Sequence, residues 1–517
     1  MSDAVDRGIT VTEISAVDQP IDVSPETTAA FIGRALRGPI DTPVLINHFG
    51  DFHRMFGACW QRSSLGPAVR QFFEHGGKKL YVVRVANNAR GAMVCLPAGG
   101  SALVLRVVEP GSTERIRAAV DYDGIPDDNT ELFNLTLQRI DPGTGLIIDQ
   151  EIHKKLSVVE SAEEFVADVL VNSQVAHVEH PYPKRRPDPT VNEDSRFELE
   201  WVDPVQPGTD GSELTDYDLI GSRERGTGLF ALEDVDHFDT LYLPATGQGI
   251  DPGPAAVLAA ELYCRRRGAM LIVDPPSQAT TAMDAVTIVK QLGYASPNIV
   301  SYFPRLCYRD DSDAAPRAAG GAIAGLMCKL DRLYGPWGSI DCDALAFQRD
   351  LKPCTQLEDD DAHTLLRAGF NAIASGPAGR ARLKGSVTMG RGSELQRVFT
   401  CLPIRRLCNR IITTVDLATR WAVFEAPDRY LTERIQGQIA AYLSYLYDIG
   451  AFETDAFVVQ CDAGIAKHED RLEHGVTILL AFHPRRSAEP VSFTLHQTVR
   501  GCRVATTAFA PATQHCA

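Results

Sequence analysis

Short apolar runs alternate with breaks rich in glycine and proline over the first part of the chain. The run AAFIG at residues 29–33 is closed by RGP at 37–39, and LYVVRV at 80–85 is nearly continuous and β-branched. Strands of that kind are typical of a parallel sheet covered on both faces. Between them, apolar residues recur at i, i+4, i+7 and i+8 and predict one apolar helix face: Leu65, Val69, Phe72 and Phe73. Residues 27–86 therefore predict the first part of an α/β core.

The same rhythm returns from residue 221. Strand patterns at 240–244, 269–274 and 298–303 alternate with helical patterns at 255–267 and 281–292, and a helix rich in small residues follows at 318–330. Strands that alternate with helices of this length indicate βαβ units and a mainly parallel sheet. Residues 221–390 are predicted to complete the core.

The segment between these two parts has a different pattern and a different charge. Strand patterns occur at 103–108, 132–139 and 146–152, and the DPGTG turn at 141–145 predicts a hairpin. Residues 87–220 hold 25 Asp and Glu against 11 Lys and Arg, which accounts for nearly all of the net charge of −16. We interpret this segment as an inserted, acidic, mainly β outer domain.

The last part of the chain predicts an α+β domain over residues 391–489. Helical patterns at 398–422 and 430–449 precede strand patterns at 457–460, 476–482 and 491–495. Residues 1–26 carry too little apolar surface to fold alone and predict an extended arm. Residues 490–517 are interpreted as a second, basic arm.

Length and charge narrow the class of protein. A chain of 517 residues is too long for one core. The net charge of −16 argues against general binding of nucleic acid, because phosphate neutralisation needs a surplus of Lys and Arg. The sequence has no run of about 18 apolar residues and no apolar signal core. We therefore expect that the protein is made in a cytoplasm and does not insert into a membrane.

The residues that carry chemistry form no recognisable catalytic or metal motif. The twelve cysteines lack any C-x-x-C spacing, so we expect mostly buried, reduced thiols. Cys502 and Cys516 lie near the C-terminus, where an inter-subunit disulfide is an open alternative. The acids at 358–361 are interpreted as a helix start, and those at 121–128 as a loop without calcium-loop spacing. We therefore expect no cofactor and no metal.

Several local patterns occur in an order that resembles contractile tail sheath proteins of phages, R-type pyocins and extracellular contractile injection systems. They are residues 27–84, VDPP at 273–276, GPW at 335–337, LRAGFN at 366–371, RWAVFE at 420–425, GAF at 450–452 and PRRSAE at 484–489. Two positions depart from the family pattern: the opening reads RGITVTE at 7–13, and Lys384 precedes Gly385 where a Trp is usual.

The resemblance implies a structural subunit with a central subtilisin-like α/β domain. Six copies would form a ring around an inner tube, and stacked rings would contract to drive the tube through a cell envelope. Implied partners are further copies, the tube protein, and baseplate and tail terminator proteins, without direct contact to nucleic acid. The particle would be a virion tail or an extracellular contractile particle, assembled in the bacterial cytoplasm.

In this family, terminal arms add strands to the sheets of neighbouring subunits. The two arms here have opposite charge, with six acids and one arginine in residues 1–30 and four arginines against one glutamate in residues 484–517. Candidate arm residues are Ile9, Val11, Glu13, Arg485, Arg486, Val491, Phe493, Leu495, Arg500 and Arg503. Arg405, Arg406 and Arg410 are a possible tube-facing group, and an ordinary solvated helix face is the alternative.

Two other functions remain as alternatives. A hydrolase on the subtilisin-like fold would need a Ser, a His and a carboxylate that converge, but no Gly-x-Ser-x-Gly turn occurs and His237 and His363 lack a signature context. The acidic domain at 87–220 is alternatively a module that binds a host surface or an accessory protein.

Overall fold

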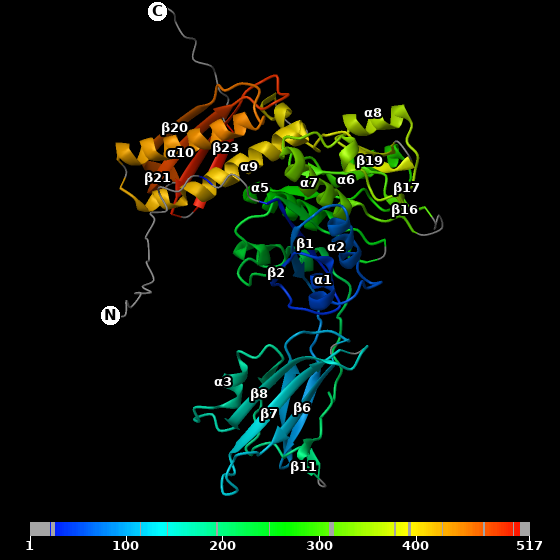
Figure 1. The fold of residues 1–517 in the computed structure, drawn as a ribbon, viewed down its shortest axis with the longest axis vertical. Helices are drawn as coiled ribbons and strands as arrows, with labels where there is room; N and C mark the ends of the chain where they lie inside the picture. Colours follow the sequence, from blue (N-terminus) through cyan, green and yellow to red (C-terminus); the bar gives the residue numbers. More distant parts are fainter. Residues whose placement is uncertain are drawn as a thin grey trace, which may run out of the picture.

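The protein is described from a computed structural model, in which three domains follow one another along the long axis (Figure 1). The structure describes residues 21, 26–113, 115–141, 143–192, 195–247, 249–309, 315–376, 379–390, 394–426, 428–468, 471–499 and 501–506. The α/β core lies between the outer domain and the C-terminal domain. None of the described helices is long and apolar enough to cross a membrane.

The core is built on a six-stranded sheet in the order β14-β13-β12-β1-β3-β2. Its strands are β1 (Thr28–Gly33), β2 (Pro43–Ile46), β3 (Lys79–Arg84), β12 (Thr240–Tyr242), β13 (Met270–Ile272) and β14 (Ile299–Val300). All neighbours run parallel except β2, which is antiparallel to β3. The predicted mixed α/β class and mainly parallel sheet are confirmed.

Helices cover both faces of this sheet because successive residues of a strand point to opposite sides. Ala29 and Phe31 of β1 pack under α1 (Phe49–Phe56), α2 (Leu65–Glu74) and α7 (Gly320–Tyr334). Ala30 and Ile32 pack under α4 (Asp216–Ile220), η2 (Gly228–Asp234), α5 (Pro254–Arg267) and α6 (Ala282–Leu292). Helices on both sides of β1 explain why the apolar run at residues 29–33 is continuous and does not alternate with polar residues.

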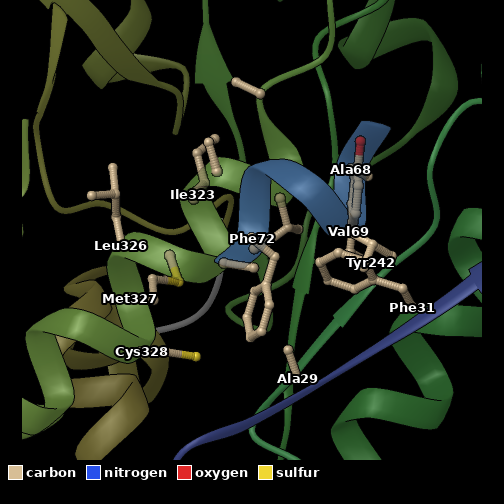
Figure 2. Close-up of a cluster of buried hydrophobic side chains, with 14 of the residues drawn as sticks. Ala29, Phe31, Ala68, Val69, Phe72, Tyr242, Ile323, Leu326, Met327 and Cys328 are labelled. Atoms are coloured by element: carbon tan, nitrogen blue, oxygen red, sulfur yellow. The ribbon is translucent and has the colours of Figure 1, made fainter. Parts of the chain in front are cut away.

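The small residues of α7 let it lie directly against α2. A Cβ on Gly321 would stand 2.3 Å from the carbonyl oxygen of Ala68, so only glycine fits there. Figure 2 shows the side chains that converge from β1, α2 and α7, with Phe31 edge-on to Phe72 at 5.6 Å between ring centroids. The glycines therefore serve close helix packing.

A smaller lobe completes the core beside α7. It holds β15 (Tyr302–Phe303), β18 (Asn371–Ser375) and β19 (Ala381–Lys384), the pair β16 (Leu306–Tyr308) and β17 (Leu351–Pro353), η3 (Asp343–Leu345) and α8 (Asp359–Arg367). A disulfide joins Cys307 to Cys354 across the β16 and β17 pair. The expectation of reduced thiols is wrong for these two cysteines, whereas the other nine cysteines of the described residues are free.

The outer domain packs two three-stranded sheets around one core. One sheet has the order β4 (Met93–Ala98), β5 (Ser101–Val107), β9 (Ala176–Glu179), and the other β6 (Arg115–Asp121), β7 (Leu132–Ile140), β8 (Ile147–Ser157). Also present are α3 (Val166–Leu170), β10 (Val191–Asn192) and β11 (Ser195–Leu199). The predicted hairpin is confirmed as antiparallel β7 and β8.

The two linkers of the outer domain lie side by side. Asn87 pairs with Ser212 and Arg90 with Thr209 as isolated antiparallel bridges. Gly211 has φ +73°, and a Cβ there would meet the Asn87 carbonyl oxygen at 2.1 Å. Glycine is therefore required for the linkers to approach each other.

The C-terminal domain packs helices on a four-stranded antiparallel sheet. The helices are η5 (Glu394–Thr400), α9 (Leu402–Thr419), η6 (Arg420–Phe424) and α10 (Arg429–Asp448). The sheet order is β20 (Val458–His468), β21 (Arg471–Phe482), β22 (Val491–Thr498), β23 (Gly501–Thr506).

Candidate assembly site

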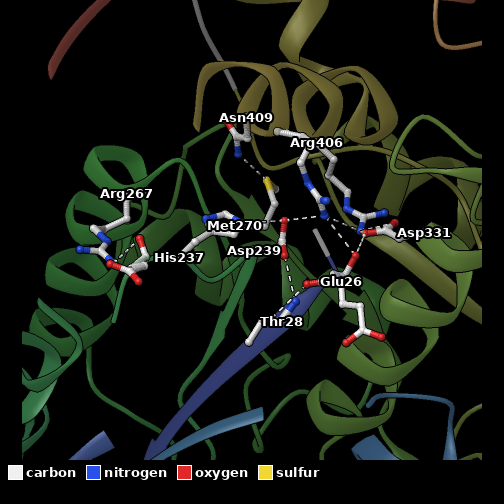
Figure 3. Close-up of polar contacts among 12 residues, drawn as sticks. Glu26, Thr28, His237, Asp239, Arg267, Met270, Asp331, Arg406 and Asn409 are labelled. Atoms are coloured by element: carbon white, nitrogen blue, oxygen red, sulfur yellow. Dashed lines mark hydrogen bonds and ion pairs between the residues drawn. The ribbon is translucent and has the colours of Figure 1, made fainter. Parts of the chain in front are cut away.

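The first strand of the core begins inside a buried cluster of charges, which Figure 3 shows. Arg406 on α9 donates from Nη2 to both carboxylate oxygens of Asp331 on α7, each at 2.7 Å, and both side chains are 5% exposed. Arg410, one helical turn later, pairs with Asp239 at 2.8 Å and lies 3.9 Å from Asp331. The cluster joins α9 of the C-terminal domain to the core.

The same charges hold the backbone just before β1. The Thr27 hydroxyl donates to Asp331 Oδ2 at 2.8 Å, and it accepts a hydrogen bond from Arg410 at 3.1 Å. The backbone amide of Thr28 donates to Asp239 Oδ2 at 2.9 Å. We call these residues, Thr27, Thr28, Asp239, Asp331, Arg406 and Arg410, the arm root, because residues 1–26 lead into them.

Burial and charge act in opposite directions on the carboxyl group of Asp239. Burial alone would raise its pKa, but Arg410 and His237 hold that pKa well below the usual value. The pKa of Arg410 is raised by Asp239 and Asp331 in spite of its burial. The groups stay ionised, and removal of one partner leaves a buried charge without compensation.

Two of the three arginines predicted to face a tube contact carboxylates of the same chain. Arg406 and Arg410, whose side chains are 5% and 11% exposed, face Asp331 and Asp239. Arg405, on a neighbouring face of α9, donates to Asn298 Oδ1 at 2.8 Å and lies over the Phe399 ring. All three side chains are held by contacts within the chain, so these contacts do not favour a group of arginines that faces a tube.

The structure also corrects the start of the predicted C-terminal arm. β22 pairs with β21 on one side and with β23 on the other, so residues 491–498 are an interior strand of the domain's own sheet. The three apolar residues placed in the arm are buried in the core of that domain: Val491, Phe493 and Leu495. Alternation of apolar residues does not distinguish an interior strand from a strand that adds to a neighbour.

The remaining predicted arm residues have different settings. Arg485 and Arg486 are exposed in the turn between β21 and β22. Arg503 is exposed on β23, and Cys502 beside it is half-buried, with its thiol pKa raised by burial and by Asp416. Four predicted residues lie outside the described part of the chain: Ile9, Val11, Glu13 and Arg500. Cys516 also lies outside it, so the disulfide with Cys502 stays a prediction.

The arrangement of domains matches solved structures over nearly the whole chain. A sheath tail protein from Listeria innocua has a TM-score of 0.62 and 15% sequence identity, with 93% of this chain and 97% of that chain covered. The chain has the tail sheath fold. A second sheath tail protein, from Desulfitobacterium hafniense, has a TM-score of 0.54 and 13% identity over 95% of this chain and 100% of that one.

A sheath complex in the contracted state also shares the tail sheath fold. This protein, from the extracellular contractile injection system PVC, has a TM-score of 0.52 and 14% identity over 95% of this chain and 96% of its own. The Tail sheath protein of Vibrio phage KVP40 is 30% identical over 162 residues, which is 30% of this chain and 22% of the phage protein. No family model matches the chain. The resemblance predicted from local patterns is confirmed by these similarities.

A further polar cluster lies at the ends of β12 and β13, and no sequence pattern predicted it. Tyr242 at the end of β12 hydrogen-bonds Asp274, which follows β13 and accepts from the Gly320 amide at the start of α7 at 3.0 Å. Arg305 pairs with Asp251 at 2.6 Å nearby. Burial raises the pKa of Asp274 although Arg305 opposes it. The cluster ties α7 to the sheet, and among the described residues no group of three or more His, Cys, Asp or Glu is placed to hold a metal ion.

Proposed function

We propose that this chain is the structural subunit of a contractile tail sheath and has no catalytic role. The observation that carries the proposal is the tail sheath fold over 93% of the chain, shared with a sheath from a contracted particle. Six copies form a ring, rings stack helically around an inner tube, and the stack shortens and widens to drive the tube through an envelope. Its partners are further copies, the tube protein, and baseplate and tail terminator proteins.

The terminal arms link the subunits in this proposal. Strands added to a sheet edge supply ladder hydrogen bonds of about 0.5–1.5 kcal/mol each, so a strand of five residues contributes a few kcal/mol per junction. Head-to-tail contacts of this kind do not close on themselves and so generate helical stacks. The arm root supports this role, because it fixes the chain to two domains at the point where residues 1–26 begin.

The direct test is electron microscopy of the chain produced together with its tube protein. We expect striated tubes that convert to a shorter, wider form when the extended state is disturbed. A chain that remains monomeric at high concentration beside intact tubes would contradict the proposal. A head attached to the tube would identify a phage, and its absence a bacteriocin or injection particle.

A surface-binding role for the outer domain is a second candidate, favoured by the exposure of β8. β8 is the last strand of its sheet, and four large apolar residues in the strand or directly before it are 44–68% exposed: Leu146, Ile147, Ile148 and Ile152. Exposed apolar edge strands are typical sites of association. Deletion of residues 87–212 should leave contractile tubes intact and abolish attachment to the target surface.

A further inference from the structure

A groove rich in arginine lies between the core and the C-terminal domain. Its volume is about 390 Å³, and residues of α5, α9 and β23 line it. Two aspartates in the groove, Asp236 and Asp416, oppose five arginines, and Asp416 already forms an ion pair of 2.8 Å with Arg420. The groove therefore keeps a surplus of positive charge. We call it the arginine groove, after the arginines that line it: Arg265, Arg266, Arg267, Arg405 and Arg420.

Arg405 lacks a counter-charge. Its neighbours on α9, Arg406 and Arg410, pair with carboxylates, whereas Arg405 pairs with none among the described residues. Its Nη2 donates to the neutral amide oxygen of Asn298 at 2.8 Å, and its Nε is buried without a hydrogen-bond partner. Burial lowers the pKa of its guanidinium group. Because a cation removed from water is costly unless an anion faces it, the groove favours an anionic occupant.

The last turn of α5 adds exposed charge beside Arg405. Arg265 lies 3.8 Å from Glu261, and its side chain is 58% exposed. Arg266 is exposed as well and forms no ion pair within the described part of the chain. An occupant with a single carboxylate would leave most of this charge unmatched. The occupant should therefore carry several carboxylates close together.

The start of α8 carries such a group of acids, at residues 358–361. The Asp361 carboxylate accepts a hydrogen bond from the backbone amide of Glu358 at 3.2 Å and so caps its own helix. Asp359 and Asp360 are exposed, and neither has an ion pair among the described residues. The helix dipole tolerates acids at this end but leaves their outer oxygens open to a cation.

The groove and the acids of α8 lie on different sides of the molecule. In Figure 1, α8 lies to one side of α7, whereas α9 and β23 lie to the other. The two surfaces therefore cannot meet within one chain. Copies arranged in a ring place core beside core, so one side of a core faces the other side of the next. Such a head-to-tail contact joins two different surfaces and can be repeated from copy to copy.

We propose that the arginine groove of one copy binds the acidic start of α8 of a second copy. Asp359 and Asp360 face Arg265 and Arg266 and supply the counter-charge that Arg405 lacks. Paired charges of this kind fix the register of two surfaces and exclude wrong partners. The inference rests on the proposed sheath function, because it names one contact through which neighbouring cores join.

Charge reversal on both surfaces tests the contact in the full chain produced with its tube protein. R265E/R266E and D359K/D360K should each lower the yield of tubes about tenfold at low salt, because like charges then face each other. A chain with all four substitutions restores opposite charges and should recover most of the yield. R429E is the matched control, since Arg429 is 91% exposed on α10 and does not line the groove. Urea midpoints near that of wild-type protein verify that the variants fold.

The outcomes separate the contact from the proposed function. Unchanged tube yield with R265E/R266E, or no recovery in the fourfold variant, would overturn the contact, and tubes from wild-type chain would leave the sheath function standing. Recovery in the fourfold variant alone would support both.

Cross-linking locates the contact without a need for tubes. Full chains with R266C are mixed with full chains with D360C, treated with a short bismaleimide, and analysed by mass spectrometry. Because the two substitutions lie on different chains, a link between residues 266 and 360 joins two copies. We expect this link, and its loss when E433C on α10 replaces D360C. Absence of the link would overturn the proposal, whereas the link in oligomers that never form tubes would support the contact and refute the sheath function.

Discussion

The core is joined to its two neighbouring domains by different chemistry. At the arm root, buried arginines meet full carboxylate charges, Asp331 and Asp239. At the outer domain, the buried Arg84 donates instead to main-chain carbonyl oxygens, to Gly38 and Pro110 at 2.6 Å each. Arg34 likewise donates to the carbonyls of Asp210 and Gly211.

The two junctions differ in the groups that accept hydrogen bonds from their arginines. Carbonyl oxygens do not titrate, so the bonds that Arg84 donates to Gly38 and Pro110 do not need an ionised acceptor. At the arm root, Arg410 and His237 keep the Asp239 carboxyl group charged by holding its pKa below the usual value although burial opposes them. We therefore expect the arm root to be the stronger of the two junctions and the more sensitive to pH.

The largest effect is expected from D331A. The substitution leaves Arg406 buried without a counter-charge and removes the acceptor of Thr27, so we expect a loss of about 3–5 kcal/mol in the free energy of unfolding. Urea unfolding followed by circular dichroism measures it. E433A is the control, because Glu433 forms an exposed pair with Arg429, and it should cost at most about 0.5 kcal/mol. A loss below about 1 kcal/mol for D331A would show that the buried pair is not what holds the junction.

The next effect is expected at the other junction. R84M keeps much of the buried volume but removes the donors to Gly38 and Pro110, and we expect a loss of about 2–3 kcal/mol. Proteolysis should then release the outer domain more readily than from wild-type protein. R90M, on the neighbouring linker, is the control. If R84M and D331A open the same boundary to protease, the two junctions are not independent.

The dependence on pH separates the two junctions directly. Because the folded-state pKa of Asp239 lies below its unfolded value, its contribution to stability is complete above about pH 4 and is lost as the pH falls toward the folded-state pKa. D239N should therefore be less stable than wild-type protein at neutral pH. Its urea midpoint should also fall less steeply as the pH is lowered, which flattens the acid limb of the plot of midpoint against pH. R84M should keep the slope of wild-type protein. An unchanged acid limb in D239N would show that ionisation of Asp239 does not cause the loss of stability at low pH.

The smallest effect is expected from K79A. Lys79 pairs with Glu26 at 2.8 Å beside the arm root, but the two side chains are 44% and 51% exposed. Solvent screens such a pair, so we expect a change within about 0.5 kcal/mol. Thermal unfolding at low and high salt checks it, and a larger change would place the exposed pair among the contacts that hold the arm.

Local sequence predicted the elements better than it predicted their partners. The run at 80–85 predicts a buried strand because residues on both faces of β3 are buried and apolar, as Leu80, Val82 and Val83 show. Arg406 and Arg410 were interpreted as surface residues, since a charged helix face is normally solvated. Their acidic partners lie 75 and 171 positions away, where no local pattern connects them.

The same limit explains the other corrections. β22 reads as a strand from sequence, but whether its two edges are filled by the same chain depends on β21 and β23 together. The disulfide joins cysteines that are 47 positions apart without a motif. Candidate sites that depend on long-range contacts therefore required the structure, whereas the fold class and the tail sheath resemblance did not.

The paired linkers of the outer domain have a consequence for evolution and for engineering. Asn87 and Ser212 form an antiparallel bridge, so the two points at which the outer domain joins the core are as close as two paired strands. This distance does not depend on the size of the outer domain. A different domain whose two ends lie about 5 Å apart, as paired strands do, could be inserted at the same site without distortion of the core. The outer domain can therefore be exchanged for another domain without a change in the core.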